Sequence, residues 1–371
     1  MSDINRPPGR MCVYGCNISY YTGKFETYLR YRSVPYDSAP TVGNYEKLKK
    51  GAGVVQMPVV QNANGSWMTD TTPMIRWMES QQSAPSIYPT DPAMNVLALL
   101  IEDYADEWLW RSAMHYRWSY RPDRQYAAES LYNSLMRGTM PFPRFIALNM
   151  LKRRQFFGYV RGDGVNKKTR FHADRTYLAV LDRLQAILET RPFILGDTPT
   201  IADFGLMAPM FRHYGQDPTP VEIMRNRAPA VYEWVARMWN AKPENSMPQL
   251  LTEPDNLLAD FLEEIAETHL AQLRQNAVAY DQGKKRYDQV IQDCHYTQLP
   301  VSRYRVWCLE ELQREYKALD DASQVRLKSW LLYPEAEIIW SGSLATSNYD
   351  PERKAPFNRG INVFDGAVPM K

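Results

Sequence analysis

In the N-terminal part of the chain, the spacing of apolar residues changes repeatedly between the strand and the helix period. Short apolar runs at 10–14 and around Pro35-Tyr36 predict strands, and the segment 22–31 between them predicts a helix. A short basic helix is expected at 44–50. The region therefore begins with the order strand, helix, strand, helix.

Residues 54–79 form the stretch around which we expect the rest to be organised. Val59-Val60 and Trp67-Met68 predict two short strands, and Asn64-Gly65 supplies the positive φ angles that a two-residue hairpin turn needs. A helix is predicted from Asp70-Thr71 onward. The complete order, βαβα followed by ββα, is typical of the thioredoxin-like fold, in which one face of a small mixed sheet is open to a ligand.

Pro58 stands at the start of a predicted core strand, where it cannot donate a ladder hydrogen bond. A cis Met57-Pro58 bond would account for it and would leave the backbone groups of Met57 free for a ligand. Asp70 and Thr71, at the start of the following helix, would lie beside them. We interpret this arrangement as a peptide-binding platform.

After a linker at 81–93 that is rich in Ser, Pro and Thr, the pattern becomes helical. Helices are predicted in four segments: 96–118, 125–136, 146–157 and 172–189. The glycine-containing stretch FGYVRGDGVNKKT is expected to be a loop. Thr200 and Asp203 have the spacing of a capping box and stand directly before an apolar helix, and one more helix is predicted at 229–239.

The last 120 or so residues have the composition of a folded segment. A helix around Leu258, two strands at 284–304 and two further helices are predicted before a proline-rich, loop-like end. We therefore expect three parts: a thioredoxin-like α/β domain at 1–82, an all-helical domain at 93–248, and an α+β C-terminal extension at 249–371.

Charge and composition narrow the possible partners. The formal net charge is only +2, which gives no reason to expect nucleic acid or an anionic membrane as a partner. No apolar run approaches the roughly 20 residues that span a bilayer, and the first ten residues lack the apolar segment of a signal peptide. Four cysteines indicate no dense disulfide framework. The expectation is a soluble cytoplasmic protein.

Four spaced motifs resemble the glutathione S-transferase superfamily over about residues 10–248. The motifs are Tyr14 to Ser19 with the following helix, Gln56-Met57-Pro58 at the family's cis-proline position, Asp70-Thr71 where the family has an acidic residue and Ser, and Leu195 to Phe204 with its capping box. Segments 24–30, 102–108 and 157–165 are similar to the metaxin and failed-axon-connections branch. The extension lies outside the common fold.

The resemblance implies a glutathione transferase that acts in detoxification as a homodimer. Glutathione would be bound as co-substrate by five residues: Gln56, Met57, Pro58, Asp70 and Thr71. The backbone of Met57 would pair with the cysteinyl amide, and Asp70 with the γ-glutamyl amine. Gln56, or one of Lys49 and Lys50, would reach the glycyl carboxylate. The simpler interpretation of Asp70-Thr71 is a helix cap.

The thiol of glutathione must ionise before it attacks an electrophile, and a hydroxyl at a helix start can favour the thiolate. By loop length, the resemblance gives this role to Ser19, which would alternatively only cap its helix. Cys16 is a competing candidate for the thiol chemistry and is otherwise a structural thiol. Tyr14, Tyr20 and Tyr21 are further hydroxyl candidates, although each is more often a packing residue.

A hydrophobic electrophile is the expected second substrate. Tyr14, Tyr21, His115 and Trp118 are candidates for its pocket, although aromatic residues at helical spacing are more often core. The five histidines are scattered without metal-ligand spacing, so no metal is expected. Two alternatives stay open: a non-catalytic binding or scaffold protein of the same fold, and a glutathione-dependent lyase or thiol-disulfide oxidoreductase that uses Cys16.

Overall fold

The structure is a computed structural model that describes residues 10–83, 85–136, 143–244, 249–341 and 346–360. Its N-terminal part is a four-stranded sheet in the order β2-β1-β3-β4. The strands are β1 (Met11–Tyr14), β2 (Tyr36–Ala39), β3 (Val59–Gln61) and β4 (Trp67–Thr69). β2 runs parallel to β1, whereas β3 is antiparallel to both β1 and β4.

Three helices cover the two faces of this sheet: α1 (Tyr20–Tyr31), α2 (Tyr45–Ala52) and α3 (Thr71–Glu79). Strand alternation decides which side chains meet each helix. Val13 shares the main core with residues of α1 and α3, whereas Cys12 and Tyr14 pack with Leu48 of α2 on the opposite face. The predicted thioredoxin-like domain is confirmed.

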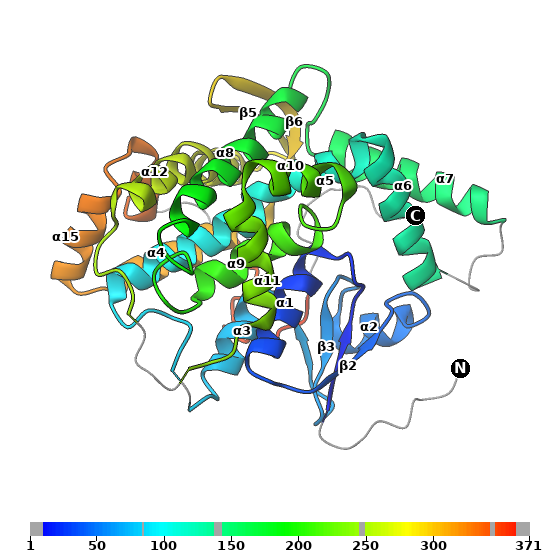
Figure 1. The fold of residues 1–371 in the computed structure, drawn as a ribbon, viewed down its shortest axis with the longest axis horizontal. Coiled ribbons are helices and arrows are strands. Elements are labelled where there is room, and N and C mark those ends of the chain that lie inside the picture. Colours follow the sequence, from blue (N-terminus) through cyan, green and yellow to red (C-terminus); the bar gives the residue numbers. More distant parts are fainter. Residues whose placement is uncertain (1–9, 84, 137–142, 245–248, 342–345, 361–371) are drawn as a thin grey trace.

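The second part is entirely helical, as predicted (Figure 1). Its elements are α4 (Pro92–Asp103), η1 (Tyr104–Trp108), α5 (Leu109–Ser119), α6 (Arg121–Leu131), η2 (Tyr132–Met136), α7 (Arg144–Gln155), η3 (Phe156–Arg161), α8 (Arg170–Leu188), α9 (Ile201–Arg212), α10 (Pro218–Arg227) and α11 (Pro229–Asn240). α9 lies against both α1 and α4 and so joins the two parts through one continuous core.

The capping box at the start of α9 is confirmed. The buried carboxylate of Asp203 accepts hydrogen bonds from the backbone N–H groups of Thr200, at 2.9 Å, and Ile194, at 3.0 Å. Trp234 donates to it from α11. Asp203 therefore holds the entry of α9 and ties two neighbouring segments to it.

The C-terminal region is the predicted α+β extension. It contains α12 (Asn256–Ile265), η4 (Ala266–Leu270), α13 (Ala271–Asp281), β5 (Arg286–Ile291), β6 (Cys294–Pro300), α14 (Arg303–Lys317), α15 (Asp321–Trp330) and η5 (Pro334–Ile339). α12 packs on α8, and α14 and α15 pack on α4. Among the described residues, no helix is both long and apolar enough to cross a membrane.

The chain after η5 returns to the N-terminal domain. The C=O of Pro356 accepts from the N–H of Thr69 on the edge strand β4, and the N–H of Gly360 donates to the C=O of Ala52. The ring of Phe357 packs edge-to-face on Trp77 of α3. This part of the predicted loop-like end wraps over the body, while 342–345 and 361–371 lie outside the described residues.

Two local predictions were wrong. The stretch expected to be a loop from Phe157 begins as the π-helix η3, because helix α7 continues through Gly158. The hairpin between β3 and β4 is closed by a bond from Asn62 N–H to the C=O of Ser66, so the turn is longer than two residues. Gly65 alone of the predicted pair has positive φ.

Candidate functional site

Three loops meet at one end of the N-terminal sheet. Tyr14, Val59 and Thr69 are paired side by side across β1, β3 and β4. The residues that follow Tyr14, precede Val59 and follow Thr69 therefore lie at the same end of the sheet. These are the loop that leads to Ser19, the Met57-Pro58 pair and Asp70. The sheet register brings together the three groups that the sequence predicted as one site.

The Met57-Pro58 bond is cis, as predicted. Neither the N–H nor the C=O of Met57 makes a backbone hydrogen bond to another described residue. Gln56 and Met57 are half-buried beside the buried Pro58. The backbone of Met57 thus presents one donor and one acceptor at the end of β3, where an extended peptide could pair with it.

Asp70 stands at the N-cap position of α3 but does not cap it. Its backbone has φ 71°, and its side chain makes no cap hydrogen bond. Oδ1 accepts instead from the phenol of Tyr304, at 3.0 Å, whereas Oδ2 is buried without a hydrogen-bond partner. Burial raises the pKa of Asp70 to about 7, although Tyr304 and Lys24 act in the opposite direction. Thr71, the first residue of α3, is buried beside it.

Ser19 caps α1. Its hydroxyl accepts from the N–H of Thr22 at 3.4 Å, a long contact that leaves the hydroxyl proton free to donate elsewhere. The side chain is half-buried, in contrast with the buried Tyr20 that follows it. Capping and an additional contact with a ligand are therefore compatible.

Arg117 of α5 holds the loop before Ser19 in place. Its guanidinium donates to the C=O of Ile18 at 2.6 Å and makes a bidentate pair with Asp217 at 2.8 and 2.9 Å. A further bond goes to the C=O of Arg212. Both members of the ion pair are buried, so the loop is fixed to the helical domain by a charge that has no access to water.

Cys16 lies in the same loop but is poorly placed for thiolate chemistry. Its side chain is buried, and burial raises the pKa of the thiol although Arg117 and Arg212 lower it. A thiol in such surroundings stays protonated at neutral pH. The structure thus distinguishes Cys16 from the half-buried hydroxyl of Ser19.

The structure does not bring the four candidate pocket residues to one place. Trp118 joins an apolar cluster that also contains Cys16, Ile18 and, at its edge, Met57. Tyr21 stacks on Trp110 and donates to the C=O of Asp106 at 2.9 Å.

The other two candidates lie elsewhere. Tyr14 faces α2 and stacks on Trp67, because it alternates with Val13 along β1. His115 is buried and bonds to Asp174 of α8 and to Ser119. The structure therefore does not bring Tyr14 and His115 to the apolar cluster at Met57.

Comparison with known proteins gives two matches in this chain. Residues 13–86 match the model of the glutathione S-transferase N-terminal domain, and residues 149–242 match that of the C-terminal domain. The two matches stand in the order and positions of the thioredoxin-like and helical parts described above. Over these two regions, the chain carries the N-terminal and C-terminal domains of the glutathione S-transferase superfamily. No match was found among curated proteins.

Three solved structures are similar to parts of the chain. The beta-etherase LigF from Sphingobium sp. strain SYK-6 is 16% identical, covers 62% of this chain and 94% of its own length, and has a TM-score of 0.44. A GST-like protein from Pseudomonas syringae is 18% identical over 70% of this chain and 74% of its own, with a TM-score of 0.42. A glutathione S-transferase from Methylobacterium radiotolerans, in complex with glutathione sulfonate, is 15% identical over 65% of this chain and 100% of its own, with a TM-score of 0.37.

A buried ionic cluster between the two transferase domains was not predicted from the sequence. Lys24 of α1 is fully buried and bonds to Glu102, to Asp106 and, at 3.1 Å, to Thr72 of α3. Burial tends to lower the pKa of Lys24, but Asp106 and Glu102 raise it, so the amine stays charged. The sequence contains the lysine and the two acidic residues at helical spacing. No local pattern in it indicates that segments so far apart pair with each other.

Tyr304 was also missed, because it belongs to the extension. Its phenol is the hydrogen-bond donor to Asp70, and its ring packs against Tyr349. Burial is the main cause of the raised pKa of Tyr349, and the neighbouring Asp70 raises it further. Two aromatic residues of the extension therefore lie beside the start of α3.

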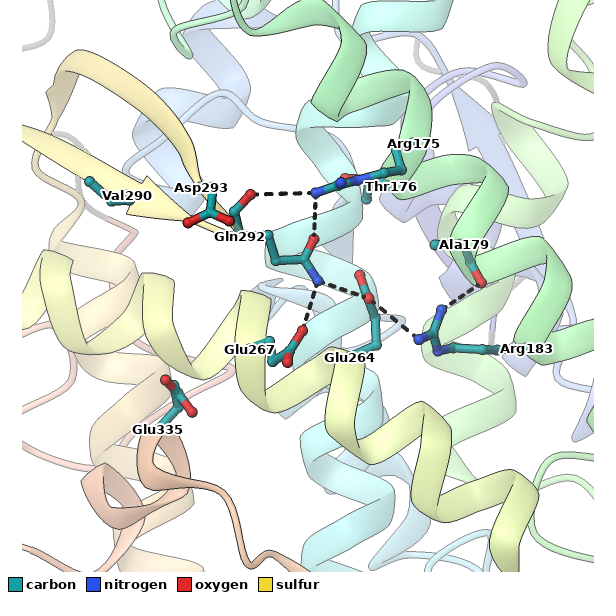
Figure 2. A pocket seen from close by; sticks show the side chains of 10 residues that line it. All are labelled: Arg175, Thr176, Ala179, Arg183, Glu264, Glu267, Val290, Gln292, Asp293 and Glu335. Atoms are coloured by element: carbon teal, nitrogen blue, oxygen red, sulfur yellow. Dashed lines mark hydrogen bonds and ion pairs between the residues drawn. The ribbon is translucent and has the colours of Figure 1, made fainter.

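A cavity of about 660 Å³ lies away from this site, between α8, the α12–η4 segment and the β5–β6 turn (Figure 2). Gln292 crosses it and donates to Glu267 at 3.0 Å and to Glu264 at 3.2 Å. Arg175 and Arg183 approach from α8. None of its lining residues is a predicted site residue. In the described residues, no group of His, Cys, Asp or Glu is placed to hold a metal ion.

Proposed function

We propose that this chain binds glutathione at the end of the N-terminal sheet and activates its thiol for attack on a hydrophobic electrophile. One observation carries the proposal: the free backbone of Met57 precedes the strand β3, whose neighbours β1 and β4 lead to the half-buried hydroxyl of Ser19 and to the incompletely bonded carboxylate of Asp70. The match of residues 13–86 to the glutathione S-transferase N-terminal domain supports the choice of ligand.

Each part of the tripeptide has a group to meet. The backbone N–H and C=O of Met57 would pair with the cysteinyl amide, next to Pro58. Oδ2 of Asp70 would accept from the γ-glutamyl ammonium, and Thr71 with the first N–H groups of α3 would donate to its carboxylate. Gln56 would reach the glycyl carboxylate. A buried carboxylate oxygen without a donor is the kind of group that a ligand cation satisfies.

Ser19 would act on the sulfur. A free thiol with a pKa of about 8.5 is only a few per cent ionised at neutral pH, so a donor hydrogen bond from the Ser19 hydroxyl would increase the thiolate fraction. The sulfur would then attack the electrophilic carbon, a C–S bond would form, and the leaving group would depart with its electron pair. The thiol proton would pass to water.

The electrophile would approach from the helical domain. The apolar cluster around Met57 contains Trp118 and Ile18, so a hydrophobic group above the sulfur would meet apolar side chains. Tyr21 stands at the neighbouring turn of α1. Activity as a detoxifying transferase in the cytoplasm, and assembly as a homodimer, belong to the same proposal.

One observation favours a second candidate, a non-catalytic binding protein of the same fold. Oδ2 of Asp70 is buried from solvent, and Tyr304 and Tyr349 of the extension lie against the carboxylate. If these two aromatic residues keep the γ-glutamyl subsite closed, the chain would neither bind glutathione nor turn over. The Cys16 alternative has less support, because the thiol is buried and its pKa is raised.

Two steps test the proposal. The full chain is passed over immobilised glutathione, and retained protein is then assayed with glutathione and a nitro-substituted aryl chloride. Retention that free glutathione reverses, followed by release of chloride, is the expected result. Failure of both steps would overturn the proposal and favour the non-catalytic protein with a closed subsite. Retention without turnover would overturn the activation of the thiol and leave only glutathione binding.

A further inference from the structure

Residues 144–171 place large apolar side chains on the surface rather than in the core. Phe145 is 67% exposed, Phe157 58%, Phe171 55% and Met150 51%. Four such side chains within one short segment differ from the scattered single apolar residues that are normal on a protein surface.

The same segment is strongly cationic. Between residues 144 and 170 the chain has eight lysines and arginines and one acidic residue, Asp163. Asp163 is itself paired with the buried Arg111 at 3.2 Å, so it does not neutralise the surface. The formal charge of the whole chain, +2, hides this concentration because the rest of the chain is net acidic.

Helix α7 shows how the two kinds of side chain share one face. Its inner face is aliphatic and buried, and consists of Ala147, Leu148 and Leu151. The opposite face is exposed and carries four residues: Phe145, Asn149, Met150 and Arg153. Figure 1 shows α7 reaching outward at the right edge of the molecule. An outer face that is both apolar and cationic lacks a partner within the described part of the chain.

We propose that this basic aromatic segment, with the exposed residues Phe145, Met150, Arg153, Phe157, Lys168 and Phe171 as its contact residues, docks the protein onto an anionic lipid membrane. Lysines and arginines would lie at the headgroups, and the phenylalanines and methionine would enter the boundary of the acyl chains. This is peripheral binding parallel to the membrane surface. It goes beyond the proposed glutathione chemistry and does not depend on it.

The positive charge of these residues argues against a second copy of the chain as their binding partner. A symmetric contact through this surface would place each cationic patch against its twin, and like charges facing each other oppose association. A nucleic acid would satisfy the cations and could stack bases on the phenylalanine rings, but it would leave the aliphatic Met150 uncovered. A lipid interface satisfies the cations and the apolar side chains together.

The test is flotation of the full chain with two sets of vesicles, phosphatidylcholine alone and phosphatidylcholine with about one third phosphatidylglycerol. We expect binding to the anionic vesicles that is at least several-fold stronger than to the neutral ones and that falls as salt is added. Phe145→Ser with Phe157→Ser should reduce the bound fraction about ten-fold, and Arg153→Gln with Lys168→Gln several-fold.

Matched controls come from exposed residues elsewhere. Leu332→Ser and Lys284→Gln should leave vesicle binding unchanged, since both residues are exposed outside the segment. Circular dichroism checks that each variant is folded, and Met150→Ser replaces the phenylalanine pair if that variant unfolds. The proposal is overturned by equal binding of both vesicle types, by no binding, or by losses in the controls as large as in the variants. It is also overturned if the chain binds RNA but not vesicles, or self-associates through Phe145 and Phe157.

Discussion

The phenol of Tyr304 donates a hydrogen bond of 3.0 Å to Oδ1 of Asp70, and so connects the C-terminal extension to the proposed glutathione site. The two residues are 234 positions apart. The contact lowers the pKa of a carboxyl that burial raises to about 7. Because the γ-glutamyl ammonium would pair with the ionised form, the extension helps to set the charge of the site.

Replacing Tyr304 by Phe should weaken glutathione binding near neutral pH. In the native chain, affinity should increase as the pH rises through about 7, where Asp70 ionises. Without the phenol the pKa of Asp70 rises further, so the same increase should occur at higher pH. Calorimetric titrations over a series of pH values measure this. Tyr316→Phe is the control, since that phenol is on the same helix but bonds to Gln324. An unchanged pH curve would show that Tyr304 does not act on Asp70.

Replacing Asp70 by Asn should stabilise the fold while it weakens glutathione binding. The pKa of Asp70 is about 7 in the folded chain and about 4 when unfolded. The folded state therefore binds more protons between these values, and the contribution of Asp70 to the free energy of unfolding is lost as the pH rises from about 4 to about 7. Asn carries no charge and tolerates positive φ.

At pH 8 the Asp70→Asn chain should be about 1–3 kcal/mol more stable to urea, and its stability should change less between pH 4 and 7. Retention on immobilised glutathione should be weaker than that of the native chain. A variant that is less stable at pH 8 and retained as strongly as the native chain would contradict the interpretation of Asp70 as a ligand group held at a cost to folding.

Ser19→Ala and Cys16→Ala separate the two candidates for action on the sulfur. Loss of the Ser19 hydroxyl should move the midpoint of the pH–rate profile upward, towards the value of about 8.5 for a free thiol, and leave binding to immobilised glutathione intact. Capping predicts only a loss of stability, of at most about 1 kcal/mol. Cys16→Ala should keep the native profile. A large loss confined to the Cys16 variant would reverse the assignment.

The buried cluster around Lys24 should be essential for stability. Lys24→Met leaves Glu102 and Asp106 buried without their cation, and should cost about 3–5 kcal/mol in urea unfolding. Arg227→Met is the matched control, because the Arg227–Asp182 pair is about half exposed on each side. That variant should lose less than about 1 kcal/mol. Equal losses would mean that the cluster contributes no more than a surface pair.

Local signals predicted much of the fold. The periodicity around Val59 and Trp67, the proline at 58 and the capping box at Thr200 each depend on neighbouring residues, so the sequence alone indicated the two transferase domains. The prediction for η3 was wrong because glycine was expected to end a helix, whereas Gly158 continues one. The prediction for the hairpin was wrong because only Gly65 of the Asn64-Gly65 pair has positive φ and the turn is longer.

The parts of the site that depend on distant residues were not predictable. Arg117 stands in a segment that was expected to line a pocket, yet its partner Asp217 is 100 positions away and carries no local motif. The bond from Tyr304 to Asp70 joins the extension to a domain whose own pattern gives no sign of it. His115 was predicted as a pocket residue, but its ring bonds to Asp174.

The most direct test of the central claim is calorimetric titration of glutathione into the full-length chain at pH 8, beside the Asp70→Asn variant. The account predicts saturable binding at one site per chain, and an affinity about ten-fold or more lower in the variant, as expected for a lost charge-assisted hydrogen bond. Absence of binding at millimolar glutathione, or equal affinities in the two proteins, would contradict a glutathione site at Met57 and Asp70.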